Sequence, residues 1–452
     1  LRPVLTPIMR GIFDPAQSVA AAWSPLSLWP DGILSPGMWI SPRTLTSEWQ
    51  DYTGTTPVVT PGTVADTSNP VGLALDIRAG ATVLTDPGNH MLQSTSAARP
   101  LMSARRNLLT YTEDLTASAW AAGNAVTRGV NTITATGTDN VQVAQNTGAR
   151  SGEKITVTFK VKKGLSFSII ATDAWTVGNT AGFDGTTGAY FASGSLNGPY
   201  PLVSYSCVTD ADPLYWLASA TFTSNVNGTS NVGVILNKNK VTSWGWSGCC
   251  DIGDVLEFGD VKQYERGSSY SGYQSVPGDG STYATAFPIF QLYDGVDDGM
   301  ATAAFSAGDL INGMDCMIPV RRDSAAACVA GLYNGIADAT KFFGMAESAS
   351  GSGCVGSGAG TPTVWVDGVQ LSGGTAVTRG TLHTALTVGD YHILEFRGLD
   401  LSAWTAAGFG LYTSYVFPGA RGDIMLYPST DSTADKDAAR QYLADYYGVT
   451  LP

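Results

Sequence analysis

The stretch KITVTFKVKK (residues 154–163) carries the clearest strand signal in the chain. Polar and apolar residues alternate along it, which is typical of a strand with one buried face. The same alternation recurs in YWLASATFTS (residues 215–224) and DVLEFGDVKQY (residues 254–264). With turn signals such as Asp184–Gly185 between the runs, these stretches predict an antiparallel β-sandwich that ends near Gly267.

A second group of strand patterns fills residues 287–428. It includes FPIFQLYDG, GMDCMIPV, TPTVWVDGVQL, YHILEFRG and GDIMLYP. The dipeptide Asp367–Gly368 separates two short apolar alternations, which predicts a two-residue hairpin turn. The Gly- and Ser-rich residues 269–286, between the two groups, are interpreted as a linker.

One helix is predicted near the end of the chain, over residues 435–447. Ser432 and Asp435 form an S-x-x-D start signal, and Gly448 stands where a left-handed cap ends a helix. Apolar positions recur at helical spacing on one side only. We therefore expect this helix to dock on a sandwich.

Residues 1–100 have a different character, because they hold twelve of the 22 prolines. Proline removes a backbone donor, so this stretch is not expected to form regular sheet or helix. Four tryptophans argue equally against a free linker: Trp23, Trp29, Trp39 and Trp49. We interpret the stretch as an extended segment that orders against its own subunits or against a larger particle.

Composition excludes several classes of protein. A net charge of −13 without a basic stripe disfavours nucleic acid as a partner. No run of about 18 apolar residues exists, so membrane insertion is not expected. The six cysteines are irregularly spaced, which indicates reduced thiols in a protein assembled in a reducing cytoplasm.

Several of these stretches resemble virion proteins of tailed phages and prophages. Residues 48–100 (EWQDYTGTTPVVT…NHMLQSTSAARP) look like a lead-in found before laminin-G-like, or concanavalin-type, domains, although of its fuller SGNGNH form only Gly88–His90 are present. A DGVDD strand usually follows that lead-in, and here it appears only at residues 294–298. Residues 101–286 therefore look like an insertion.

The ends of that insertion, NLLTYTEDLTASAW and GDVLEFGDVKQYERGSSYSGY, resemble those of jelly-roll, carbohydrate-binding-module-like domains. The last strand and helix, in residues 422–451, resemble the laminin-G family's closing elements. The resemblance implies an all-β chain of tandem sandwiches in four parts. These are an extended virion-anchoring segment (1–100), a jelly-roll carbohydrate-binding-like domain (101–268), a linker (269–286) and a laminin-G-like sandwich with the C-terminal helix (287–452).

No catalytic residues are predicted. The three histidines, His90, His383 and His392, stand in no recognisable motif with a nucleophile and a carboxylate. The paired glutamates of laminarinase-type relatives are absent from the strand patterns, so the chain is expected not to be an enzyme.

Aromatic residues are the best candidates for binding, because the C–H faces of sugars stack on Trp and Tyr rings. TSWGWSG places Trp244 and Trp246 on one side of an extended segment, and Trp175 and Trp216 are further candidates. The alternative is that these rings pack a core or a subunit interface.

No cofactor is expected, with calcium as the one candidate. Asp294, Asp297 and Asp298 offer the hard oxygen ligands that Ca²⁺ prefers. The alternative, which we favour, is that these short acidic side chains shape a turn.

The resemblance implies a structural and adhesive virion protein, a head or tail fibre or spike. Such a protein would attach through residues 1–100 to portal, capsid, tail or collar proteins, form a homotrimer and bind host-surface polysaccharide. Two alternatives stay open: a polysaccharide depolymerase on the same scaffold, and a decoration or collar protein that makes only protein contacts.

Overall fold

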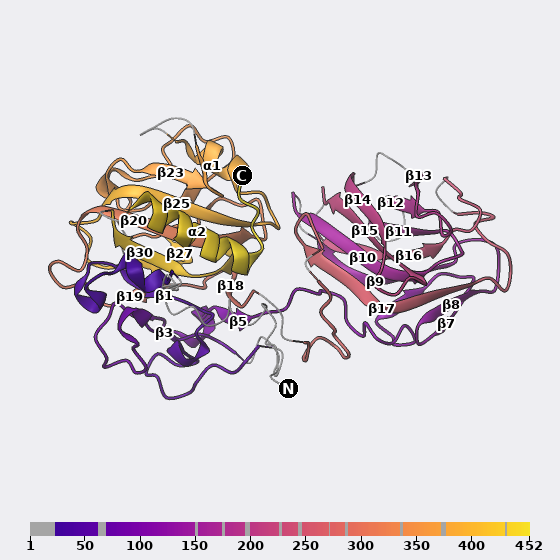
Figure 1. The fold of residues 1–452 in the computed structure, drawn as a ribbon, viewed down its shortest axis with the longest axis horizontal. Coiled ribbons are helices and arrows are strands. Elements are labelled where there is room, and N and C mark those ends of the chain that lie inside the picture. The colour runs from indigo at the N-terminus through magenta and orange to yellow at the C-terminus, as the bar shows by residue number, and fades with distance from the viewer. Residues whose placement is uncertain are drawn as a thin grey trace, which may run out of the picture.

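Two β-rich domains lie side by side in the computed structural model (Figure 1). It describes residues 23–61, 69–149, 152–173, 177–194, 199–225, 228–242, 246–270, 272–284, 288–334, 338–371, 377–429 and 432–452. These residues form 30 strands and two α-helices, α1 (Arg379–Ala385) and α2 (Thr433–Tyr447). The prediction of an all-β sandwich architecture with a C-terminal helix is confirmed.

The inserted domain is a sandwich of two six-stranded antiparallel sheets (Figure 1, right). One sheet has the order β14 (Leu202–Thr209), β15 (Tyr215–Thr223), β10 (Lys154–Lys162), β17 (Val255–Arg266), β8 (Thr132–Ala135) and β7 (Val126–Gly129). The other has the order β13 (Tyr190–Gly194), β12 (Val177–Phe183), β11 (Phe167–Asp173), β16 (Gly228–Leu236), β9 (Gln142–Ala149) and β6 (Trp120–Ala122). The predicted alternation holds along β10, since Ile155, Val157 and Phe159 lie in the core between the sheets.

The second domain is built on a nine-stranded sheet. Its main order is β24 (Val369–Gln370), β23 (Thr363–Val366), β25 (Tyr391–Asp400), β20 (Asn312–Arg322), β29 (Pro418–Arg421), β18 (Phe290–Asp294) and β5 (Leu101–Ser103), while β30 (Ile424–Pro428) pairs with β20 and β1 (Met38–Ile40). A five-stranded sheet has the order β2 (Glu48–Trp49), β3 (Leu73–Ala74), β4 (Met91–Leu92), β19 (Met300–Thr302) and β26 (Gly408–Phe409). Two strand pairs complete the domain: β21 (Cys328–Val329) with β22 (Met345–Ala346), and β27 (Leu411–Tyr412) with β28 (Tyr415–Val416). Asp367 and Gly368, both with positive φ, form the predicted hairpin turn between β23 and β24.

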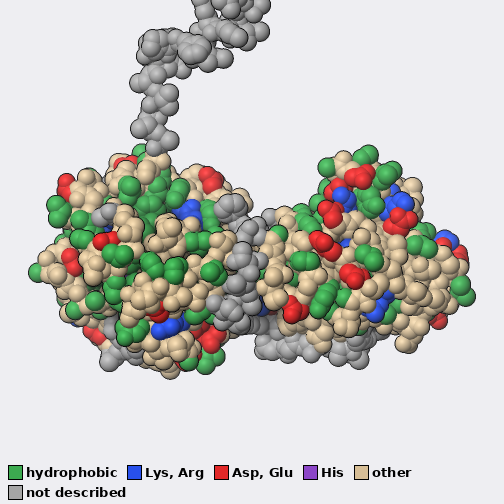
Figure 2. Space-filling view, turned by 90° about the horizontal axis from the view of Figure 1, so that it is seen from below, with side chains coloured by type: hydrophobic (Ala, Val, Ile, Leu, Met, Phe, Trp, Pro, Cys, Tyr) green, Lys and Arg blue, Asp and Glu red, His purple; other side chains and the backbone are tan. Residues whose placement is uncertain are grey.

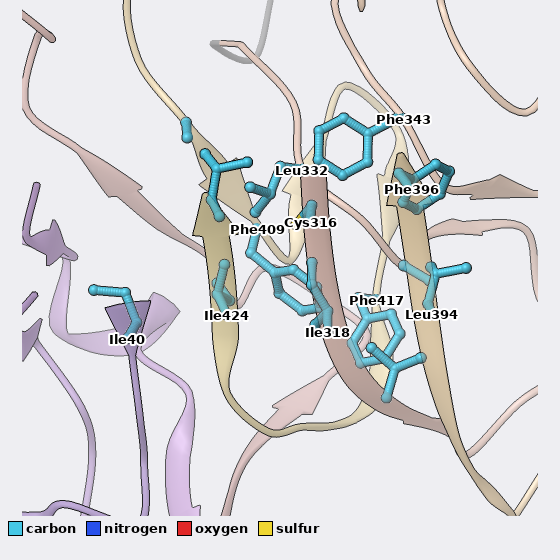
Figure 3. Close-up of a cluster of buried hydrophobic side chains, with 14 of the residues drawn as sticks. Ile40, Cys316, Ile318, Leu332, Phe343, Leu394, Phe396, Phe409, Phe417 and Ile424 are labelled. Carbon is cyan, nitrogen blue, oxygen red and sulfur yellow. The ribbon is translucent and has the colours of Figure 1, made fainter. Parts of the chain in front are cut away.

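The N-terminal segment belongs to this second domain, which corrects the prediction of a separate extended segment over residues 1–100. β1 pairs with β30, and β3 and β4 continue the five-stranded sheet. The strands are two or three residues long, so they fit between the prolines instead of containing them. In the core, Ile40 lies with Ile318 and Ile424 (Figure 3). Residues 1–22 lie outside the described residues.

The chain leaves and re-enters the second domain at neighbouring strands. β5 pairs antiparallel with β18, and Leu101 lies opposite Leu292 in the register. The predicted insertion is therefore a domain whose two ends meet at one edge of the nine-stranded sheet. N-terminal strands before it and C-terminal strands after it build one core.

The interpretation of residues 269–286 as a linker is wrong for the described part of that stretch. Gln274 is fully buried and its amide Nε2 donates to the carbonyls of Ala104 and Ala284, at 2.8 and 2.7 Å. Its Oε1 accepts from the backbone N–H groups of Arg106 and Asn107. Because these bonds tie both crossings between the domains together, the stretch is a packed part of the junction.

Helix α2 ends as predicted, but it begins at Thr433, two residues before the predicted start and directly after its cap Ser432. The Ser432 side chain accepts from the Asp435 N–H, and Gly448 adopts the left-handed conformation. The helix buries Ala439, Leu443 and Tyr447 against the sheet and the N-terminal segment. At the same place buried Asp423 accepts from Trp39 Nε1, Arg43 and the Tyr447 hydroxyl, so one carboxylate joins β1, the following loop and α2.

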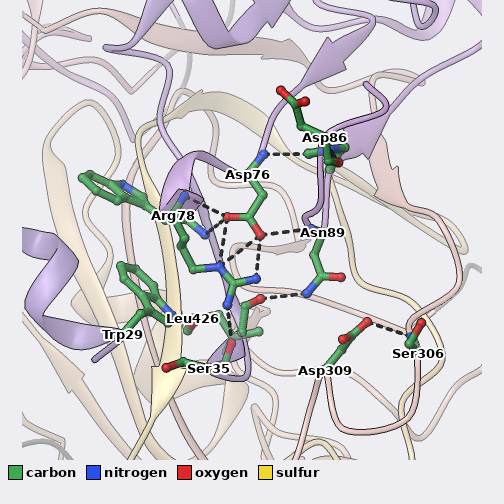
Figure 4. A network of polar contacts seen from close by, with 12 residues as sticks. Trp29, Ser35, Asp76, Arg78, Asp86, Asn89, Ser306, Asp309 and Leu426 are labelled. Carbon is green, nitrogen blue, oxygen red and sulfur yellow. Dashed lines mark hydrogen bonds and ion pairs between the residues drawn. The ribbon is translucent and has the colours of Figure 1, made fainter. Parts of the chain in front are cut away.

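A second buried carboxylate organises the N-terminal segment. Asp76 forms a fully buried ion pair with Arg78 at 2.7 Å and accepts the backbone N–H of Trp39 (Figure 4). Asn89 donates its N–H to the same carboxylate, and His90 Nδ1 accepts the Asp76 N–H. The Gly88–His90 remnant of the lead-in motif thus has a structural role.

The six cysteines are free thiols, and all but Cys207 are buried. None of the helices in the described ranges is long and apolar enough to cross a membrane.

We expect residues 104–284 to fold as an isolated fragment, whereas residues 288–452 alone should not. The first fragment holds a complete two-sheet core, but the second lacks β1 to β5 and the N-terminal side chains that fill its core. Thermal unfolding followed by circular dichroism checks this. Co-expressing residues 23–103 with residues 288–452 should restore a cooperative transition, and cooperative unfolding of residues 288–452 alone would contradict the interleaved fold.

Replacing Asp76 by Ala should destabilise the second domain by about 3–5 kcal/mol, because buried Arg78 loses its partner. Asp437→Ala is the matched control, since it removes an exposed aspartate from an Arg–Asp pair on α2 at 2.9 Å and should cost less than about 1 kcal/mol. Urea unfolding measures the free energy of unfolding of both variants. Equal decreases would contradict the stabilising role given to the buried Asp76–Arg78 pair.

Candidate functional site

Two of the four tryptophans predicted to stack on sugars are core residues. Trp216 is 8% exposed, and its Nε1 donates to the Gly185 carbonyl at 2.8 Å. Lys163 Nζ lies 4.1 Å from its ring centroid, and the Gly188 backbone packs against the ring as well. Trp246 is 2% exposed. The prediction is therefore corrected for both, because each ring is used in packing. Trp175 and Trp244 lie outside the described residues.

A cavity of about 530 Å³ lies between the two domains. The inserted domain and its connection contribute Arg106, Glu265 and Tyr270 to its lining, and the second domain contributes Tyr391, His392 and Tyr446. Its volume falls within the range of about 300–1,000 Å³ that is usual for small-molecule sites. Sequence reasoning did not find it, because its walls come from segments far apart in the chain.

Side chains of both charges line the cavity, and carboxylates behind the lining pair with two of its arginines. Arg266 is paired with Glu153 and lies 3.6 Å from Asp323 across the junction, while Arg321 binds Asp323 at 2.8 Å. Asp323 raises the pKa of Arg321 against the effect of burial. Burial lowers the pKa of Arg106, with Glu265 acting in the opposite direction. The cleft is thus polar and close to charge-balanced, which suits a neutral, hydroxyl-rich ligand better than a polyanion.

Asp390 is the main polar contact across the junction. Its carboxylate accepts from the Ser268 N–H at 2.7 Å and from Lys154 Nζ at 3.3 Å, both in the inserted domain. The Lys154 N–H also donates to the Val388 carbonyl. Gly389 makes this approach feasible: its φ is +91°, and a Cβ there would lie 2.8 Å from the Lys154 carbonyl oxygen. These contacts set the width of the cleft.

His392 lies in a chain of hydrogen bonds that sequence reasoning missed. Its Nε2 is 2.8 Å from Thr387 Oγ1, and its Nδ1 is 2.7 Å from Asp367 Oδ2. This is the connectivity of a hydroxyl–imidazole–carboxylate triad. Thr387 Oγ1, however, also donates to Asp390 at 2.9 Å, and Thr387 does not line the cleft. These hydrogen bonds therefore hold the loop that carries Asp390 in place. His90 and His383 bond to backbone groups instead.

A second cavity, of about 330 Å³, lies on the outer face of the β14–β15–β10 sheet. Ser206 lies opposite Ser219 in the register, and Ser204 lies opposite Thr221, so hydroxyl groups form its floor. Leu217 and Val208 add an apolar patch, and Tyr205 and Tyr270 flank it. Tyr205 is 51% exposed and stacks on Tyr190, with ring centroids 3.9 Å apart. We call this cavity the serine trough.

The structure brings the three predicted calcium ligands together. Ligand atoms of Asp294, Asp297 and Asp298 lie within 4.8 Å of one another. Asp298 accepts the Asp294 N–H and Asp294 accepts the Val296 N–H, so both shape the turn as the alternative required. Burial, with the two neighbouring carboxylates, raises the pKa of Asp298 to about 7. Calcium stays a hypothesis, which calorimetric titration with calcium chloride of the chain and its Asp297→Asn variant tests.

No protein-family model matches the chain, and no curated protein sequence matches it. The cleft and the serine trough are therefore the features from which a function can be inferred. On the face shown in Figure 2, acidic, basic and apolar side chains are intermingled over both domains and form no basic stripe.

Replacing Gly389 by Ala should separate the two domains without unfolding either, because the new Cβ collides with the Lys154 backbone. Gly398→Ala is the matched control: its φ is also positive, +79°, but nothing lies within 4 Å of a Cβ there. Small-angle X-ray scattering should show a larger radius of gyration for Gly389→Ala only. Identical scattering of the two variants would contradict the role given to this contact.

Proposed function

We propose that the chain is a structural and adhesive protein of a phage virion that binds host-surface glycans at the junction of its two sandwich domains. The observation that carries the binding proposal is the pair of adjoining cavities at this junction, which combine hydroxyl groups and tyrosines with, in the larger cavity, side chains of both charges. The virion setting is supported by the resemblance of residues 48–100 and 422–451 to phage fibre and spike proteins.

The lining chemistry matches the two kinds of surface that a sugar presents. Pyranose rings expose apolar C–H faces, which pack on tyrosine rings, and hydroxyl groups, which need donors and acceptors. Ser204 and Ser206 are exposed in the serine trough, and Tyr270 stands beside them. Each serine hydroxyl both donates and accepts, so the floor can satisfy sugar hydroxyls in several orientations.

Attachment to other virion proteins (portal, capsid, tail or collar) is proposed for the N-terminal part of the chain, in a narrower form than residues 1–100. Much of residues 23–100 is folded into the second domain. Leu26 and Leu34, however, are 47% and 85% exposed. Exposed leucines near the start of a folded domain offer a contact to a larger assembly. A homotrimer, the usual state of phage fibres, is part of this proposal.

We expect the chain to bind a subset of bacterial surface polysaccharides on a glycan array, and Tyr270→Ala to weaken that binding about tenfold. A tenfold loss of affinity corresponds to about 1.4 kcal/mol of binding free energy, which is of the size expected for one stacked ring. Tyr52→Ala is the control, because Tyr52 is 44% exposed on the second domain and lines neither cavity. Binding that survives Tyr270→Ala unchanged, or no binding at all, would refute the site.

The depolymerase alternative is separated by a second assay. Incubation of the purified chain with a bound polysaccharide should yield no new reducing ends, because two of the cleft carboxylates, Asp367 and Asp390, are engaged in hydrogen bonds within the protein. Release of reducing ends that Glu265→Gln abolishes would favour the enzyme instead.

A further inference from the structure

The cleft and the serine trough have a common wall. Ser268, Ser269 and Tyr270 line both cavities, so the two spaces adjoin along this short segment. We propose that one extended glycan chain occupies both cavities and crosses the wall at Ser268–Ser269. The substrate class is then a linear polysaccharide recognised along its length, and this inference rests on the proposed function.

The wall is held in place from both domains. The Gly267 N–H donates to the Lys154 carbonyl, and its own carbonyl accepts from Thr156 Oγ1 at 2.8 Å. The Ser268 carbonyl accepts from Thr221 Oγ1, while the Ser268 N–H donates to Asp390 of the second domain. Because the backbone groups are occupied on both sides, the wall does not need to be ordered by the ligand, which lowers the entropic cost of binding.

The wall between the cavities carries small, solvent-exposed side chains where the glycan would cross it. Ser268 and Ser269 are both exposed, and their side chains are among the smallest that carry a hydroxyl group. Tyr270, next to them, is half-buried and belongs to both linings. A chain that crosses here meets hydroxyls that can bond to it and a tyrosine beside them, whereas a bulky residue at Ser269 would close the passage.

Both ends of the path offer groups that a sugar can use. In the serine trough these are the hydroxyls of Ser204, Ser206 and Ser219. In the cleft they are the exposed polar side chains of Asp445 and Thr450. Tyr446 also lines the cleft, where its oxygen accepts the Ile289 N–H.

Two linked subsites predict a particular dependence on chain length. A fragment that fills one cavity gains the contacts of that cavity alone. A fragment that spans the wall gains the second set intramolecularly, at a high effective concentration. Affinity should therefore rise steeply over the length at which a fragment first reaches both cavities and then level off.

The test uses fragments of increasing length, made by partial acid hydrolysis of a bacterial surface polysaccharide that the array shows to bind, and calorimetry with the full chain. For the unmodified protein we expect the affinity to rise at least tenfold between the shortest and the spanning fragments, or about 1.4 kcal/mol. Ser269→Trp should abolish this rise while leaving the affinity of the shortest fragments unchanged.

Ser352→Trp is the control, because Ser352 is exposed on the second domain and lines neither cavity. Affinity that does not depend on length, or a Ser269→Trp variant that behaves as Ser352→Trp does, would overturn the extended-chain inference while leaving glycan binding intact. If no polysaccharide binds, the proposed function fails and this inference fails with it. Thermal unfolding of each variant establishes that it is folded.

Discussion

The short antiparallel pairing of β5 with β18 is the constraint on which the rest of the structure depends. It closes the second domain around the insertion, since one strand precedes the inserted domain and the other follows it. It also holds the two crossings side by side, where the Gln274 amide donates to Ala104 in one and to Ala284 in the other. The junction between the domains, with its cleft and its serine trough, exists because the chain crosses twice at one sheet edge.

Local signals predicted the parts of the fold that depend on local chemistry. Alternation along residues 154–163 found β10, Asp367–Gly368 found a hairpin, and Ser432 with Gly448 found both ends of α2. The N-terminal strands escaped prediction because two- or three-residue strands carry no period to detect. They form because distant partners, such as β30 for β1, supply the hydrogen bonds.

The candidate site was predicted less well, for a related reason. Residue type alone suggested tryptophan, but alternation along β15 turns Trp216 toward the core, and its ring is already covered. The residues that line the cavities are serines and tyrosines whose significance depends on which strands are adjacent. Ser206 and Ser219 lie opposite each other because of the register between β14 and β15. Tyr270 lines the same cavity, although it comes from a stretch that was interpreted as a linker.

We expect ligand binding at the junction and not on either sandwich alone. The most direct measurement is a crystal structure of the full chain with a bound oligosaccharide. We expect sugar density along the wall at Ser268–Tyr270, with contacts from the inserted and the second domain. Density confined to loops of one domain, away from this wall, would contradict it.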